Sequence, residues 1–158
     1  MAVDRRIIDP FTQEELLVPE WATDEDAIQR ASARRSSAWR VLNIFPEWGH
    51  DWPIWEAGVS HDGSDADDLE LPASLRQEIS EWYREWAEKT RPMIGWDNHD
   101  DRTRWVQHGN ALFDQVEKSV WLFADVNRKF SIRNPPGSLD AKVACGNNAP
   151  AEGYQSCV

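Results

Sequence analysis

Short apolar runs separated by turn residues divide the first third of the chain into three predicted elements. Residues 5–18 hold two such runs on either side of Asp9-Pro10, a dipeptide that suits the first two positions of a turn. We therefore predict an N-terminal β-hairpin over residues 5–18. Thr23 then precedes three acidic residues, which predicts a helix that continues to about residue 36. Threonine can cap the first free amides of a helix, and the helix dipole favours acids in the first turn.

The next stretch predicts two strands around a turn. Residues 39–45 are rich in strand-forming side chains, and Pro46 ends this run. A second extended segment, residues 52–56, follows the turn. Three of the ten tryptophans lie between residues 48 and 55, so this part of the chain is its most aromatic.

Helical periodicity dominates the second half of the sequence. Apolar residues recur at intervals of four, three and four from residue 75, which predicts an amphipathic helix from about residue 73 to residue 90. A last helix is predicted to begin near residues 100–103. It continues to Phe130, or it ends near Phe123 and is followed by a strand over residues 126–132; the alternation over residues 125–132 favours the strand. The apolar positions of these two helices are Leu75, Ile79, Trp82 and Trp86, then Trp105, Leu112, Val116 and Phe123.

Together these elements predict an α+β fold. We expect a small single domain with an N-terminal hairpin, a short β-sheet and two to three amphipathic helices. The domain is predicted to span residues 1–134, with the hairpin at 5–18 and the core at 39–132, and residues 135–158 are predicted to form a C-terminal tail. Leucine is sparse, so the large tryptophan side chains are expected to supply much of the buried area.

The order of aromatic motifs between about residues 39 and 132 is distinctive. Trp-Pro-Ile-Trp-Glu at 52–56 is followed by an acidic segment, by Leu-Pro-Ala-Ser-Leu at 71–75, by Trp82-Tyr83 with Trp86, and by Gly95-Trp96. This order resembles small Trp-rich acidic proteins of actinobacteria and their phages, a group with no assigned activity. The resemblance implies a compact α+β domain and a role in phage–host or toxin–immunity conflict.

The charge of the chain limits which classes of macromolecule we expect it to bind. The net charge is −11, and residues 41–75 contain eight acids without a single lysine or arginine. Such a surface repels nucleic acid and anionic lipid and attracts a basic protein surface. No apolar run is long enough to cross a bilayer, and the first residues lack the features of a signal peptide, so we expect a cytoplasmic protein with no membrane contact.

Candidate catalytic chemistry is sparse. No nucleophile elbow or phosphate-binding glycine loop occurs, so we expect no catalytic residues and no cofactor. Cys145 and Cys157 are either free thiols or a disulfide that holds the tail, and they have no histidine at a zinc-ligand spacing. Three His-Asp pairs, at 50–51, 61–62 and 99–100, resemble pairs that hold divalent ions, but they are predicted to lie in loops. We therefore expect no metal site.

The candidate binding site lies where the aromatic stretch meets the acidic one. Trp55 is expected in the core with Trp82 and Trp86. Trp48 and Trp52 flank a turn, where a large ring is harder to bury and can anchor a protein partner. The predicted partner-binding residues are Trp48, His50, Asp51, Trp52, Asp62, Asp65, Asp67 and Asp68.

These residues favour a non-enzymatic, acidic protein-binding module that engages a basic partner surface as an inhibitor, immunity factor or adaptor. Two alternatives remain open from sequence. The chain could be a structural component of a phage or another assembly, with its termini reaching neighbouring copies. It could also be a metal-dependent hydrolase that uses His50, His61 or His99.

Overall fold

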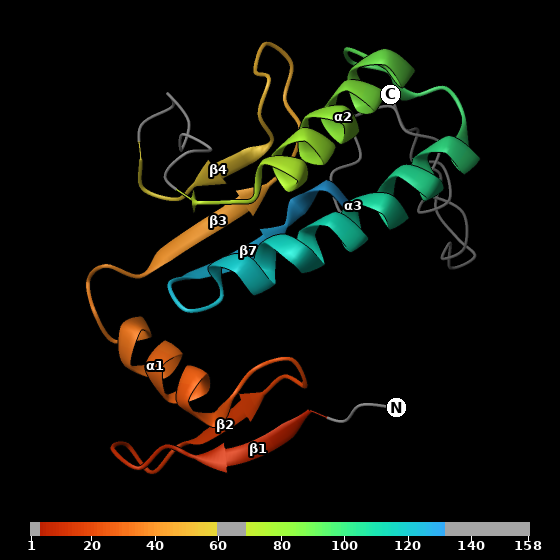
Figure 1. The fold of residues 1–158 in the computed structure, drawn as a ribbon. Coiled ribbons are helices and arrows are strands. Elements are labelled where there is room, and N and C mark those ends of the chain that lie inside the picture. Colours follow the sequence, from red (N-terminus) through yellow and green to blue (C-terminus); the bar gives the residue numbers. More distant parts are fainter. Residues whose placement is uncertain (1–3, 60–68, 132–158) are drawn as a thin grey trace, which may run out of the picture.

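The structure, a computed structural model, describes residues 4–59 and 69–131. It shows an α+β domain with an N-terminal hairpin, as the sequence predicts (Figure 1). The hairpin and the first helix form one layer, and a three-stranded sheet covered by two long helices forms the main body. The elements in chain order are β1 (Arg5–Ile8), β2 (Glu15–Val18), α1 (Asp24–Arg34), β3 (Arg40–Ile44), β4 (Ile54–Glu56), α2 (Ala73–Lys89), β5 (Thr90–Arg91), β6 (Gly95–Trp96), α3 (His99–Val120), β7 (Ala124–Arg128) and the 3-10 helix η2 (Lys129–Ser131).

Local sequence signals account for the N-terminal layer. β1 and β2 pair antiparallel from Arg5 opposite Val18 to Ile8 opposite Glu15, as the hairpin prediction requires. α1 starts with a capping box: the Thr23 hydroxyl accepts the Asp26 amide at 3.1 Å, and the Asp26 carboxylate accepts the Thr23 amide at 3.0 Å. The reciprocal bonds satisfy two of the free amides at the helix start. This cap fixes where the hairpin segment turns into α1.

The main sheet has the order β4-β3-β7, with β3 antiparallel to β4 and parallel to β7. The return from β4 to β7 passes through α2 and α3, which lie on one face of the sheet (Figure 1). The predicted strands at 39–45 and 52–56 are confirmed as β3 and β4. The final strand is also confirmed, but it begins at Ala124 and ends at Arg128, where η2 takes over.

The end of α3 differs from the sequence expectation. Phe123 was predicted on the apolar face of this helix, whereas α3 ends at Val120 and Phe123 lies just before β7. Its carbonyl accepts the amide of Arg40, at the start of β3, at 3.1 Å. Pairing with β3 thus ends the helix early, because the backbone at Phe123 already belongs to the sheet edge.

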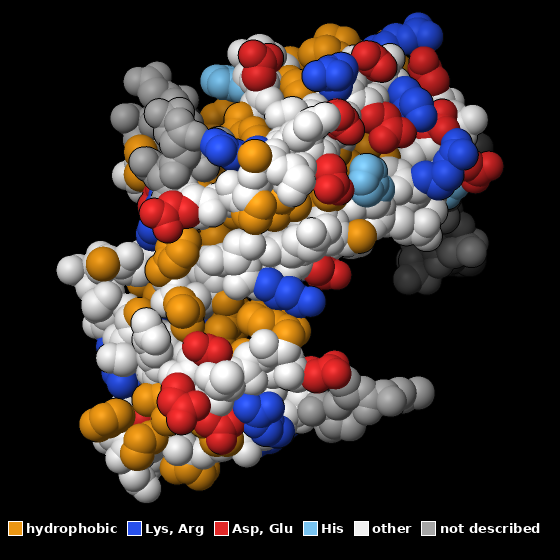
Figure 2. Space-filling view, viewed as in Figure 1, with side chains coloured by type: hydrophobic (Ala, Val, Ile, Leu, Met, Phe, Trp, Pro, Cys, Tyr) orange, Lys and Arg blue, Asp and Glu red, His pale blue; other side chains and the backbone are white. Residues whose placement is uncertain are grey.

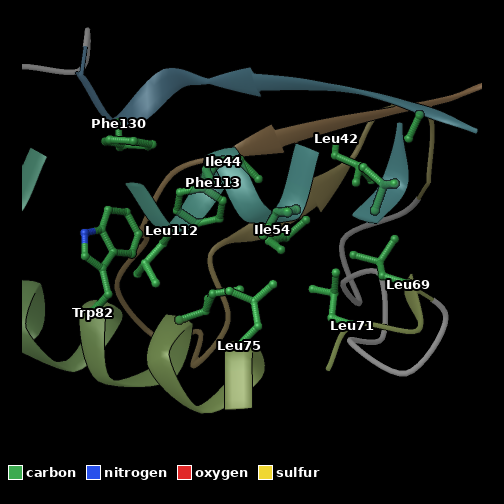
Figure 3. Close-up of a cluster of buried hydrophobic side chains, with 14 of the residues drawn as sticks. Leu42, Ile44, Ile54, Leu69, Leu71, Leu75, Trp82, Leu112, Phe113 and Phe130 are labelled. Atoms are coloured by element: carbon green, nitrogen blue, oxygen red, sulfur yellow. The ribbon is translucent and has the colours of Figure 1, made fainter. Parts of the chain in front are cut away.

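The main core lies between the sheet and the two long helices. Leu42, Ile44 and Ile54 point from the strands toward Leu75 and Trp82 of α2 (Figure 3). Leu112, Phe113 and Phe130 close the same cluster from α3 and η2. The helix stripe predicted from residue 75 is confirmed for Leu75, Ile79 and Trp82, which are all buried.

Arg30 joins the N-terminal layer to the main body. Its guanidinium lies 4.9 Å from the ring centre of Trp39 and 4.8 Å from that of Trp121. It donates to the Asp125 carboxylate at 2.6 Å, to the Ala124 carbonyl at 3.2 Å and to the Trp121 carbonyl. A small second core surrounds this contact, made of Val18, Ala22, Ala27 and Trp121. The two layers are therefore held together by this stacked and bonded arginine, by a second pair between Arg34 and Asp125, and by apolar packing.

Candidate functional site

The turn between β3 and β4 positions the candidate site. The amide of His50 donates to the Glu47 carbonyl at 3.4 Å, which closes a four-residue turn. Gly49, the third residue of this turn, has a φ of +86°, the left-handed value that a type II turn requires there. The turn sends its two aromatic side chains to different neighbours. Trp48 packs against α2, and His50 packs edge-on against Trp55 with 4.7 Å between ring centres.

Trp48, Tyr83 and Trp86 form a continuous aromatic surface, which we call the aromatic edge. The Trp48 ring centre lies 4.8 Å from that of Trp86, and the Trp86 ring lies 5.7 Å from Tyr83. The Tyr83 hydroxyl donates to the Glu47 carbonyl at 2.9 Å. Trp48 nevertheless remains 42% exposed. The edge thus presents a large ring that the helix and the turn already hold in place.

Carboxylates border the aromatic edge. Glu47 and Asp51, on either side of Trp48 in the turn, are both exposed. Partial burial and the negative charge of Asp51 together raise the pKa of the Tyr83 hydroxyl above its usual value of 10.0. Asp51 therefore acts electrostatically on the edge. A ring face next to carboxylates is a favourable position for a guanidinium or ammonium group.

The structure separates the tryptophans of this stretch. One of Trp48 and Trp52 was expected at the surface; Trp48 is 42% exposed, and the Trp52 side chain packs against the main core. Trp55 was expected in the core, but it lies opposite Asn43 and stacks on Phe45 at 5.3 Å. The physical reason is the two-residue alternation of a strand. Ile54 takes the buried position of β4, so Trp55, the next residue of the strand, takes the other side of the sheet. Trp52 precedes β4.

The remaining predicted residues separate into two groups. Trp48, His50 and Asp51 lie together on the turn, all exposed. Asp62, Asp65, Asp67 and Asp68 lie outside the described residues, as do Cys145 and Cys157. Sequence reasoning missed Tyr83. It assigned Trp86 to the core; Trp86 does pack against the main core, but it is only partly buried and also contacts Trp48. The spacing of three between Tyr83 and Trp86 on α2 was the available signal, because such residues share one helix face.

The described residues offer little for metal or membrane chemistry. Within residues 4–59 and 69–131, no group of three histidine, cysteine, aspartate or glutamate side chains is placed to hold a metal ion. His50 belongs to the β3–β4 turn and His99 to the start of α3, so these two candidates stand on different elements. Over the same two ranges, every helix is too short or too polar to span a bilayer.

The turn between β3 and β4 and the adjoining face of α2 thus combine packed aromatic rings with exposed carboxylates. Comparisons with protein-family models, curated proteins and solved structures found no match to this chain.

Proposed function

We propose that this chain is a non-enzymatic protein-binding module whose aromatic edge engages a basic surface on its partner. The observation that supports this most strongly is the state of Trp48, which is 42% exposed yet packed 4.8 Å from Trp86. A large ring that is already held in place can be buried by a partner at a small cost in side-chain entropy. Anchors of protein interfaces have this property, and tryptophan is enriched among them.

Charge supports a partner with lysine or arginine side chains. Glu47 and Asp51 border the ring, and the net charge of −11 steers cationic surfaces toward the molecule. We further propose that Asp62, Asp65, Asp67 and Asp68 enlarge this acidic surface. An inhibitor, immunity factor or adaptor of the cytoplasm would use such a face, in keeping with the conflict role that the sequence resemblance implies.

The proposal can be tested with defined probes before a partner is known. The ¹⁵N-labelled protein is titrated with an arginine-rich peptide and with a peptide of equal length in which glutamine replaces arginine. We expect the arginine peptide to shift the indole resonance of Trp48 and the amides of Tyr83 and Trp86. Binding should weaken as salt rises, because screening reduces attraction between exposed charges.

Trp21 provides a matched control for Trp48. It is 43% exposed and packs against another tryptophan, Trp121, with 5.2 Å between ring centres. Trp48→Ala should abolish the peptide-induced shifts, whereas Trp21→Ala should leave them in place. Equal loss in both variants, or equal binding of the glutamine peptide, would contradict the proposal.

A further inference from the structure

A second surface, far from the aromatic edge, lies on the outward face of α1. An open groove of about 490 Å³ runs along this helix. One side of the groove comes from the hairpin turn and the other from one helix face, through Phe11, Glu25, Ile28, Gln29, Ser32 and Ala33. Figure 2 shows hydrophobic side chains gathered around the N-terminal hairpin, whereas charged side chains dominate the surface over the ends of α2 and α3.

Phe11 is the most unusual residue of this groove. Its side chain is 78% exposed, which is costly for an aromatic ring in water. The backbone beneath it is firmly held. The Phe11 amide donates to the Asp9 carboxylate at 2.8 Å, and Arg35 donates to the same carboxylate at 3.1 Å. Asp9 itself is fully buried. The fold therefore fixes the base of an exposed apolar side chain.

We infer that a second copy of this chain occupies the groove, with the two α1 helices antiparallel about a two-fold axis. A two-fold interface needs a surface that complements itself. Glu25 lines the groove in the first turn of α1, and Arg35, whose side chain is 43% exposed, stands at the C-cap at the other end of the helix. Antiparallel pairing places the acidic end of each copy beside the basic end of the other. It also offers the ring of Phe11 the small side chains of the opposite copy, Ser32 and Ala33.

Other charges around the groove are compatible with this pairing. Arg35 already donates to Asp9, but its guanidinium has five N–H donors and can also donate to a carboxylate of the second copy, whereas Arg34 is directed toward Asp125 and Trp39 of the main body. Glu25 makes no ion pair within the described residues, and a partner cation would satisfy it. The net charge of −11 opposes self-association over long range. The contact is also small, so we infer a weak dimer in rapid exchange.

Sedimentation velocity tests this inference without reference to the proposed function. At about 0.15 M salt, where the Debye length is about 8 Å, the wild-type protein should sediment faster as its concentration rises over about two decades. Phe11→Ala should sediment as a monomer throughout that range. Ser32→Arg, which fills the groove from an exposed position, should do the same. Circular dichroism of both variants should match the wild type, because both side chains are exposed.

Met93 provides the control, because it is an apolar side chain exposed to a similar extent, 82%, in the turn between β5 and β6. Met93→Ala should associate as the wild type does. A wild-type protein that stays monomeric at every concentration would overturn the inference, as would Phe11→Ala or Ser32→Arg variants that still associate. Loss of association in Met93→Ala would overturn it as well. Failure of the peptide titration at Trp48 would not affect this result.

Discussion

Trp82 and Trp105 bond to each other twice across the interface of the two long helices. The indole N–H of Trp82 donates to the Trp105 carbonyl at 3.0 Å, and the indole N–H of Trp105 donates to the Trp82 carbonyl at 2.9 Å. Their rings stack with 4.1 Å between centres and an angle of 9°. Both residues are buried, so the pair satisfies two polar groups that burial would otherwise penalise. This pair fixes how α2 lies against α3.

Phenylalanine at these positions tests the value of the indole bonds. Trp82→Phe removes a bonded N–H and leaves the Trp105 carbonyl without this donor, so we expect a loss of about 2–4 kcal/mol of unfolding free energy. Trp52 is the contrasting case, because its buried indole nitrogen has no hydrogen-bond partner among the described residues. Trp52→Phe should therefore cost clearly less. Urea unfolding measures both, and equal losses would show that ring volume alone decides stability here.

Gly109 supplies a second test of the same interface. A Cβ at this position would lie 2.8 Å from Cζ2 of Trp82 and 2.9 Å from its Nε1. We expect Gly109→Ala to destabilise the fold by about 1–3 kcal/mol. The free-energy cost of overpacking is larger than the roughly 1 kcal/mol by which alanine stabilises a helix relative to glycine. In a Trp82→Phe background the same change should cost less, because the smaller ring leaves space. Additive losses in this double-mutant cycle would exclude a direct clash.

The sequence predicts elements well where several residues repeat one signal. The stripe of Leu75, Ile79 and Trp82 and the cap at Thr23 each depend on near neighbours, and the structure confirms both. The end of α3 was harder to place, because residues 120–124 are apolar without a period. The position of Trp55 outside the core was hard to predict for a similar reason. β4 has only three residues, too few for alternation to show which side is buried.

Contacts between residues far apart in the sequence could not be predicted for a different reason. The parallel pairing of β3 with β7 joins residues about eighty positions apart, and no local pattern encodes it. One contact of the candidate site could not be predicted for the same reason. Trp48, His50 and Asp51 were predicted from their turn, but Tyr83 reaches Glu47 only because α2 packs beside that turn.

Arg30 and Arg34 allow a test of how the N-terminal layer is attached. Both pair with Asp125, but the Arg30 side chain is 17% exposed and the Arg34 side chain 56%. Arg30→Ala leaves Asp125 and two carbonyls without this donor, so we expect a loss of about 2–4 kcal/mol. Arg34→Ala should cost under about 1 kcal/mol, as exposed pairs do. Hydrogen exchange should also show faster opening of β1, β2 and α1 in Arg30→Ala. Similar exchange in the two variants would contradict a special role for Arg30.

Asp9 makes stability depend on pH in the acid range. The bond from the Phe11 amide, followed by the interactions with Arg35 and Thr12, outweighs desolvation and lowers the pKa of Asp9 below its usual 3.8. The folded state therefore binds the proton less readily than the unfolded state. The resulting stabilisation is complete above pH 3.8 and is lost as the pH falls through the lower folded value.

Asp9→Asn should accordingly be less stable than the wild type at neutral pH, because its amide cannot pair with Arg35 as a carboxylate does. The two proteins should converge as the pH falls below 3.8, since only the wild type has this charge to lose. Urea unfolding over a pH series measures the difference. A gap that stays constant down to the lowest pH would show that the Asp9 charge is not the cause.

A substitution at Tyr83 tests whether the aromatic edge binds its partner because the Trp48 side chain is already held in place. Its hydroxyl bonds to the Glu47 carbonyl at 2.9 Å, and it does not need to touch a partner to act. Tyr83→Phe keeps the ring beside Trp86 but frees the turn that carries Trp48. Loss of this bond should weaken binding of the arginine-rich peptide about fivefold, which corresponds to about 1 kcal/mol of ordering now required on binding. NMR relaxation should show faster motion of the Trp48 indole in the free variant. If Trp48 stays as rigid as in the wild type while affinity falls, the hydroxyl contacts the peptide directly; if neither changes, Tyr83 does not position the edge.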